Sequence, residues 1–532
     1  MSFTGLVAEL PIGSKGLVGS KNQALIAPGH LLTADNLSYF GDVLTKEGGA
    51  TKYNATEITA TPAVLAGIDW WPTPGTQRMV VVTQAGEILK DDGGGTFGTV
   101  LKTGLTITAD DIPEFVEGGK EAAANDRKLF IYVPGVHIQV LAEDAATTTD
   151  IATPTGDWTA GKPTTGNMHV NRHWATGNSN DPYRVYYSSL TNHEEFTGGT
   201  AGSFAVYPGE GEKNVKLISF KGLQVIFRYP RGIYVIDTRD PTPGNWSVDR
   251  LSRTLGAAGS GCVVPVEDDV LFMDVTGNIH LLSTVTEFGN LGTRTVSDIA
   301  NFQTYIKENA NIGKLLRARS VLYPRRREVH FALAGTGSTR NNARLVMDIT
   351  RPEDLKFRWS TRDVCESLWL RRNSDGEDTL TSGDASGFVW LMDQETKSKD
   401  SGSYAGIFQS SHDDLSWLDP KLATIRKNGK FLELVVEPIG NWNMDVGVYW
   451  DGVLHQTVSF NMGVTGVALG SFELGSDILG NSPLANRKRR VTGSGRRISL
   501  RGINSGAGQD FSVLRFLLHF KPSGERLEAD AS

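Results

Sequence analysis

Short runs of β-branched and aromatic residues alternate with glycine-containing turns through the middle of the chain. Each unit has one apolar run, a turn with glycine and a second apolar run, the pattern of two antiparallel strands joined as a hairpin. Five clear copies lie at residues 78–90, 128–141, 223–237, 269–282 and 379–393. Their turn glycines are Gly86, Gly135, Gly232, Gly277 and Gly387.

The hairpins recur at a spacing of about 50 residues, which is typical of a repeat architecture. Two gaps are about twice as long as the others, and each holds a weaker copy, at 184–196 and 327–349. A small sheet made from one unit cannot cover its own apolar faces, whereas packing between two neighbours does so. The pattern therefore predicts an all-β fold with a roughly seven-bladed β-propeller over residues 61–397.

The first part of the chain lacks this repeat. Residues 1–60 are rich in glycine and weakly periodic, and we interpret them as an extended N-terminal arm that wraps the propeller or a neighbour. Within the propeller, residues 284–316 have apolar positions at helical spacing, so a short inserted helix is expected there. Those positions are Val296, Ile299, Phe302 and Ile306.

A polar stretch at 396–403 is the best candidate for a linker. Beyond it, alternating strand-like runs lie at 431–438, 445–452, 496–502 and 511–522. In the second run Val446, Val448 and Trp450 would share one face of the strand. We expect a second all-β domain at 398–532, a C-terminal β-sandwich.

Composition narrows the class of protein. The 532 residues carry a net charge of −7 and include 60 glycines, which disfavours a general nucleic-acid-binding protein. The charge is compatible with a surface past which DNA slides, because like charges repel. The two cysteines, Cys262 and Cys365, lie in apolar surroundings and are expected to be buried thiols. We identify no signal peptide and no apolar run long enough to span a membrane, so a cytoplasm or an assembled particle is expected.

The sharpest local motif is KDDGGGTFG at residues 90–98. Asp92, Gly94, Thr96 and Phe97 fit the pattern D-x-G-x-T-F, which resembles the Asp-box of sialidase-type propellers. We interpret it as a structural turn: Asp92 accepts backbone hydrogen bonds, and Phe97 fills the space between blades. A role in an active site is the alternative, and a single Asp-box says little about catalysis.

Other candidate catalytic groups have simpler explanations. FRYPRG at 227–232 is faintly similar to the sialidase F-R-I-P motif, but Tyr229 replaces the isoleucine, and Arg228 is expected to be an exposed residue at a strand end. The carboxylate pairs Glu194–Glu195, Asp268–Asp269 and Asp413–Asp414 are expected to be solvated turn residues. Histidine spacing suggests no metal site, and no phosphate loop or nucleophile elbow is present. We therefore expect no catalytic residues, no metal ion, no cofactor and no enzymatic activity.

Two basic clusters interrupt the acidic background. The first is Arg325, Arg326 and Arg327, at the start of a predicted strand. The second lies in NRKRRVTGSGRRISLR and contains Arg487, Lys488, Arg489, Arg490, Arg496 and Arg497, with Arg501 further along. Three explanations stay open: an exposed loop that aids solubility, a contact with an acidic face of a neighbouring subunit, and direct contact with DNA phosphates.

Three stretches carry a resemblance to a known family. They are residues 26–53, with Asn36 in a strand after a Pro-Gly; residues 171–196, with Asn171, Arg172, Tyr187 and Ser188; and residues 217–237 followed by 256–282. Together they resemble the β-propeller proteins of tailed-bacteriophage tails, the nozzle or tail-hub components. The likeness covers about two thirds of the chain, and the C-terminal domain departs from it.

The resemblance implies a virion structural protein that is assembled in the cytoplasm of a bacterial host. Copies of the chain, with six as the expected number, would form a ring on the tail axis beneath the portal and adaptor. Double-stranded DNA would pass through the lumen without sequence-specific binding. The N-terminal arm would then lock adjacent subunits or the adaptor.

Two other functions compete with this interpretation. A sialidase-like glycan hydrolase on a propeller scaffold would need an arginine cluster or a carboxylate pair converging at the central mouth of the propeller. A glycan-binding receptor module at the tail tip would need exposed aromatic residues on one face of the C-terminal domain.

Overall fold

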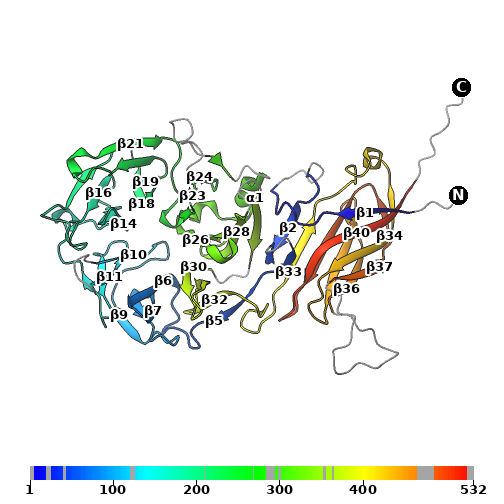
Figure 1. Cartoon of the computed structure of the whole chain (residues 1–532), viewed down its shortest axis with the longest axis horizontal. Coiled ribbons are helices and arrows are strands. Elements are labelled where there is room, and N and C mark those ends of the chain that lie inside the picture. The colour runs from blue at the N-terminus through cyan, green and yellow to red at the C-terminus, as the bar shows by residue number, and fades with distance from the viewer. Residues whose placement is uncertain are drawn as a thin grey trace.

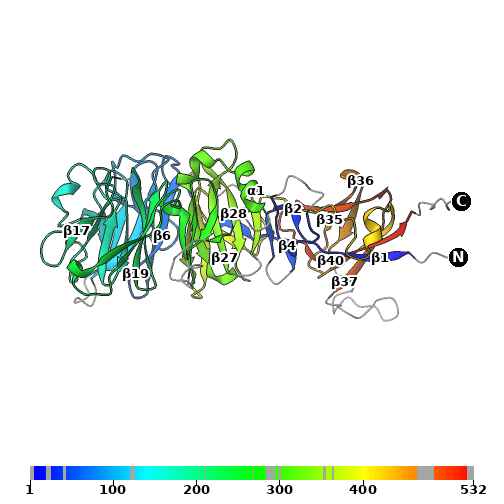
Figure 2. The same cartoon turned by 90° about the horizontal axis from the view of Figure 1, so that it is seen from above.

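The computed structural model describes residues 5–19, 26–39, 43–119, 126–209, 211–267, 269–282, 294–296, 301–350, 355–361, 365–463 and 484–523. The chain is all-β, and its strands form two regions arranged along the long axis of the molecule (Figure 1). The propeller occupies one end, and the strands of the C-terminal region occupy the other. The first and last described strands, β1 (Leu6–Leu10) and β40 (Ser512–Pro522), lie in the region away from the propeller (Figure 2).

Six separate four-stranded sheets build the β-propeller. Five of them are meanders of consecutive strands, because each short connection returns the chain antiparallel to its neighbour. These are β6 (Val64–Thr73), β7 (Thr76–Thr83), β8 (Glu87–Lys90) and β9 (Thr99–Lys102); β10 (Glu114–Gly119), β11 (Arg127–Tyr132), β12 (Gln139–Ala142) and β13 (Thr149–Asp150); β14 (Thr165–His169), β15 (Arg172–Thr176), β16 (Arg184–Tyr187) and β17 (Gly202–Ala205); β18 (Lys213–Phe220), β19 (Leu223–Tyr229), β20 (Ile233–Asp237) and β21 (Ser247–Ser252); and β22 (Val263–Val266), β23 (Asp269–Met273), β24 (Ile279–Leu281) and β25 (Arg294–Thr295).

The sixth sheet closes the ring with a strand from the other end of the chain. β30 (Ser367–Arg372), β31 (Asp378–Gly383) and β32 (Val389–Gln394) are consecutive, but the fourth strand is β5 (Gly49–Lys52). β5 runs antiparallel to β32, with Ala50 opposite Met392. β30 in turn contacts β6 of the first blade. The N-terminal segment therefore completes the last blade and ties the two ends of the propeller together.

A further meander joins the two regions of the molecule. β26 (Arg319–Tyr323), β27 (Glu328–Ala334), β28 (Asn341–Asp348) and β29 (Lys356–Ser360) form the first half of a nine-stranded sheet. β26 contacts β22 on one side and β30 on the other. The same sheet continues through β2 (Leu31–Asp35), β33 (Gly406–Ser410), β39 (Ile498–Asn504), β35 (Asn443–Trp450) and β36 (Val453–Asn461).

A seven-stranded sheet makes up the rest of the C-terminal region. Its main path is β3 (Leu37–Ser38), β4 (Leu44–Lys46), β40 (Ser512–Pro522), β34 (Lys427–Val436) and β37 (Ala485–Arg490). β1 (Leu6–Leu10) pairs with β40, and β38 (Ser494–Gly495) pairs with β34. Alternate residues of β34, β35 and β40 are buried, as their period-2 pattern predicts, because successive side chains point to opposite faces of a strand.

The described parts of residues 1–60 pair repeatedly with their own chain. β1 lies along β40, and β4 meets the other end of the same strand. Between these, β2 pairs with β33 and, at one residue, with β29. The arm thus passes from the C-terminal sheets to the last propeller blade.

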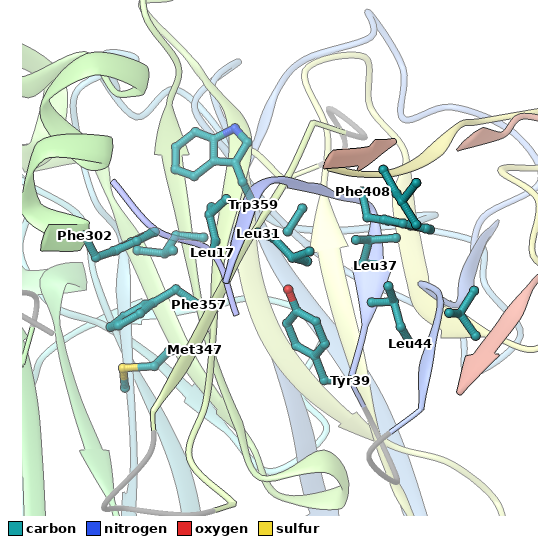
Figure 3. Packing of buried hydrophobic residues seen from close by; sticks show 14 of the residues in the cluster. Leu17, Leu31, Leu37, Tyr39, Leu44, Phe302, Met347, Phe357, Trp359 and Phe408 are labelled. Carbon is teal, nitrogen blue, oxygen red and sulfur yellow. The ribbon is translucent and has the colours of Figure 1, made fainter. Parts of the chain in front are cut away.

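One hydrophobic core runs through the junction between the regions (Figure 3). α1 (Phe302–Asn309) places Phe302 against Phe357 of β29, with the rings stacked 4.1 Å apart. Leu17 and Leu31 of the N-terminal segment pack into the same cluster, and Phe408 of β33 extends it toward the C-terminal sheets. Burial on this scale resists independent movement of the two regions, because interiors are close-packed.

Most of the predictions for the hairpins and the inserted helix are confirmed, and one hairpin prediction is wrong. All five turn glycines have positive φ, between 77° and 109°, and the helix expected within 284–316 is present as α1. The hairpin predicted at 184–196 is wrong, because only β16 lies in that range; its antiparallel partners are β15 upstream and β17 downstream. Asp268 and Ile299 lie outside the described residues.

Candidate functional site

The Asp92 turn joins β8 to β9 in the first blade. The Asp92 carboxylate accepts hydrogen bonds from the backbone N–H groups of Gly94 (2.8 Å) and Thr96 (3.2 Å). These bonds lower the pKa of the Asp92 carboxyl below its usual range. Phe97 is half-buried and lies edge-on to Tyr53 at 6.2 Å, against a cluster shared with the last blade. The geometry is that of a turn which fastens two blades.

The same carboxylate turn occurs in two hairpins where no Asp-box is written in the sequence. Asp274 accepts from the backbone N–H of Thr276 and of Asn278. Asp384 accepts from Ser386 and Phe388 in the same way. In each case the other carboxylate oxygen bonds a ring nitrogen six residues on, in His280 and Trp390 respectively. Both turns share the spacing D-x-x-G-x-x-[HW], a signal in the sequence that the Asp-box pattern does not include.

Arg228 of the FRYPRG motif is buried, not exposed as predicted. Its guanidinium donates to the Asn214 side chain at 2.8 Å and to the carbonyl oxygens of Val206 and Tyr207. The group also lies over the ring of Tyr234 at 4.2 Å. These contacts fit an arginine that joins adjacent strands, because its donors are directed at protein groups instead of a sugar carboxylate.

The carboxylate pairs serve local structure, and Asp413 is buried, not solvated as predicted. The Asp413 carboxylate accepts from the backbone N–H of Leu415 and the indole N–H of Trp417, and Asp414 accepts from Ser416. Burial raises the pKa of the Asp413 carboxyl. Glu194 forms an ion pair with Lys128 on the neighbouring blade strand β11. None of these contacts resembles a pair of carboxylates spaced around a glycosidic bond.

A hollow of about 720 Å³ lies where the first strands of successive blades begin, at one mouth of the propeller. Asp110, Glu212, Lys213, Tyr183 and Tyr229 contribute to its wall. Lys314 meets Asp110 at 3.0 Å, and Arg231 meets Glu212 at 3.1 Å. Asp111, a third carboxylate of the wall, accepts a hydrogen bond from the backbone N–H of Thr108. Lys213 lies 5.6 Å from the ring of Tyr229. The hollow offers aromatic surface and paired charges, which suit contact more than acid–base chemistry.

Several residues that carry the family resemblance lie close together in the third blade. Arg172 is buried and donates to the carbonyl oxygen of Ser188 at 2.6 Å. Its guanidinium lies 5.3 Å from the ring of Tyr187. Asn171 sits at the turn before β15 with a positive φ. These residues form a structural cluster that joins β15 to β16.

The basic triplet forms a tight turn between β26 and β27, with Pro324–Arg326 in a 3-10 helix (η9). Arg325 pairs with Glu377 at 3.3 Å, beside β31, and Arg327 pairs with Glu267 at 2.9 Å, beside β22. Arg326 is largely buried and pairs with Asp393 at 2.7 Å. The triplet therefore contacts both neighbouring sheets of its own chain, a role that none of the three sequence explanations included.

The C-terminal basic cluster is divided between two faces of a sheet. Arg487 and Arg489 lie toward β36, where their guanidinium groups donate to the carbonyl oxygens of Asn461 and Ser459. Lys488 and Arg490 lie on the opposite face. Arg496 and Arg497 use their backbone N–H groups to bond Asp451. Among the described residues, no carboxylate forms an ion pair with any of the six side chains.

Searches of the described residues for two other kinds of site found none. No group of three or more His, Cys, Asp or Glu side chains is placed to hold a metal ion in the ranges given above. In those same ranges, no helix is long and apolar enough to cross a membrane. Cys262 and Cys365 are both buried thiols, and they donate to the carbonyl oxygens of Leu315 and Ala343 respectively.

Comparison with known proteins gives likeness of structure without likeness of sequence. No family model matches the chain, and no curated protein matches it. Similar solved structures include YCF48 bound to D1 peptide, with 11% identity, TM-score 0.39, and coverage of 68% of this chain and 97% of that one. Another is BBS1N in complex with ARL6DN, with 11% identity, TM-score 0.42, and coverage of 65% and 97%. The computationally designed Ika8 protein matches with 10% identity, TM-score 0.36, and coverage of 63% and 98%.

Proposed function

We propose that this chain is a structural subunit of a bacteriophage tail, a nozzle or hub component whose copies form a ring around the path of ejected double-stranded DNA. The observation that carries the proposal is the interlocking of the chain with itself. β5 closes the propeller, β1 lies along the last strand, and β2 joins the two regions. A subunit under mechanical load benefits from such ties, because no region can separate without breaking strand pairs.

The finer architecture belongs to the same proposal. We count the β26–β29 meander as a seventh blade, since β26 contacts the first strand of the sheet on each side. We likewise regard the C-terminal sheets as a β-sandwich, since residues from both share one core. In this proposal, mechanical load passes between the C-terminal sandwich and the other six blades through the seventh blade.

The polar residues offer further support. Arg172, Tyr187 and Ser188, which carry part of the family resemblance, hold strands together. Arg228, on which a sialidase-like function would depend, is engaged by protein groups. The receptor alternative needs several exposed aromatic residues on one face of the sandwich. In the described part of the C-terminal region, the exposed large aromatic residues are Trp417, in the segment between β33 and β34, and Phe431, on β34.

Electron microscopy of the assembled particle tests the proposal directly. The full chain is purified, its mass in solution is measured by light scattering, and antibodies to it are located on virions. We expect a closed ring on the tail axis and label at the tail. A chain that stays monomeric at every concentration, alone and with portal or adaptor proteins, contradicts the proposal. So does turnover of a sialoside or oligosaccharide panel.

A further inference from the structure

One face of the seven-stranded sheet combines exposed apolar groups with unneutralised cations. Strand register aligns side chains of β1, β40, β34 and β37 in rows across this sheet. One row is Val7, His519, Phe431 and Arg490; the next is Glu9, Leu517, Glu433 and Lys488. Their neighbours in sequence, such as Leu432 and Leu518, are buried in the core. We call the two rows, with Leu514, Arg515 and Lys521, the outer C-terminal face.

The apolar part of this face is unusually open. Val7 is 47% exposed, Phe431 is 41% exposed and Leu514 is 36% exposed. The Lys488 ammonium lies 4.9 Å from the Phe431 ring, and His519 meets that ring edge-on. Contiguous apolar groups with a polar rim are typical of interaction sites on soluble proteins, whereas single exposed apolar residues are common everywhere.

The charges on the face do not cancel. Four cations, Lys488, Arg490, Arg515 and Lys521, lie beside two carboxylates. Glu9 pairs with Arg515, and Glu433 pairs with His519. Within the described residues, no carboxylate forms an ion pair with Lys488 or Arg490. Cations of this kind, next to exposed aromatic surface, suit an acidic partner with some apolar area.

The propeller of a second copy of the chain has the complementary charge. Residues 61–397 contain 41 Asp and Glu against 34 Lys and Arg, a net charge of −7, so the remaining residues are neutral overall. We propose that the outer C-terminal face of one copy docks on the acidic propeller of the next. Two different surfaces then meet, and such a head-to-tail contact closes into a ring when its rotation permits. The inference rests on the proposed function, because it assigns the surface that builds the ring.

A double charge reversal tests this contact in the full chain. The Lys488→Glu, Arg490→Glu variant is compared with Lys15→Glu, Lys421→Glu, which makes the same change in net charge at exposed positions outside both the face and residues 61–397. Mass in solution is measured by light scattering and sedimentation at about 0.05 M and about 0.5 M salt, since screening weakens exposed charge contacts. We expect the first variant to raise the dissociation constant at least about tenfold at low salt, and the control to match the wild type.

The outcomes separate the two proposals. Circular dichroism first establishes that each variant is folded, and Phe431→Ser provides a second, uncharged variant that should also weaken assembly. If both variants assemble as tightly as the wild type, the assigned surface is wrong, but the proposed ring function stands. A wild type that never assembles overturns the ring function as well. If the reversal abolishes binding of a short DNA duplex while assembly is unchanged, the face binds a polyanion and the inference is wrong.

Discussion

Two runs of basic residues look alike in the sequence and have opposite fates in the structure. Arg325–Arg327 lies between propeller sheets, and each arginine finds a carboxylate within its own chain. Residues 487–490 lie on an edge strand of the C-terminal sheet, and no described carboxylate pairs with them. The comparison teaches that a string of cations carries no function by itself. Its role depends on which acidic side chains the fold brings within reach.

The difference follows from the two architectures. A propeller blade is covered on both faces, so a polar residue between blades needs a partner there. The outer sheet of the C-terminal region has one face toward the core and one toward solvent, where water satisfies a cation. We therefore expect polar substitutions in the propeller to affect stability, and those on the outer C-terminal face to affect association.

The largest effect on stability should come from lowering the pH, through two buried histidines, His173 in β15 and His330 in β27. Burial lowers the pKa of His173 to about 3 and of His330 to about 4, while an unfolded histidine titrates near ~6.5. Protonation below about pH 6.5 therefore favours the unfolded chain, and stability falls as the pH falls toward about 4. Each group contributes at most about 1.4 kcal/mol per pH unit.

Guanidinium unfolding between about pH 7 and about pH 5 measures this slope. His330→Gln should flatten the dependence of the free energy of unfolding on pH. Equal slopes for wild type and His330→Gln would show that His330 is not buried in its neutral form.

The next largest effect should come from the triplet itself. Arg326→Ala leaves the Asp393 carboxyl buried without its cation, and burial already raises the pKa of that carboxyl. We expect a loss of about 3 kcal/mol in the free energy of unfolding. Arg490→Ala should change it by less than about 0.5 kcal/mol. Chemical denaturation checks both, and a further Asp393→Asn change should recover part of the loss. Similar losses for the two arginines would remove the contrast drawn above.

The aspartate turns should show the same contrast between a buried and an exposed position, with a smaller loss in the free energy of unfolding. Asp384 is buried and accepts two backbone hydrogen bonds and the indole N–H of Trp390. Asp384→Ala should cost about 2 kcal/mol, because buried donors lose a charged acceptor. Asp92→Ala removes similar bonds at an exposed turn and should cost less. Thermal unfolding of the two variants ranks them, and the reverse order would contradict the role of burial.

The smallest effect should be at the edge of the C-terminal region. Arg489→Ala frees the Ser459 carbonyl oxygen of the edge strand β36. We expect less than about 1 kcal/mol of destabilisation, together with more light scattering at high concentration, because an uncovered edge strand pairs with other chains. Lys488→Ala, on the opposite face, is the matched control and should not increase such scattering.

Sequence reasoning recovered the propeller hairpins because their signals are local. A glycine at positive φ and the apolar runs beside it lie within about 15 residues of each other, and all five clear hairpins have their glycine where expected. The hairpin prediction failed at 184–196, because β16 pairs with β15 and β17, and both of these strands lie outside that range. The signal of the Asp274 and Asp384 turns is equally local, since each ring partner lies six residues on, but it differs from the D-x-G-x-T-F pattern and was not recognised.

By itself, the sequence determined the kind of strands, most of their hairpins and the two-region plan, since alternation and turn residues act over a few positions. Only the tertiary structure decided that Gly49–Lys52 completes the last blade, that Leu6–Leu10 lies on β40, and that Arg228 is buried. The two strand pairings depend on partners hundreds of residues away, and the burial of Arg228 depends on groups of neighbouring strands, the Asn214 side chain and the carbonyl oxygens of Val206 and Tyr207. Strand pairing and ion pairing are set by the free energy of the whole packed arrangement, and no short window of sequence contains it.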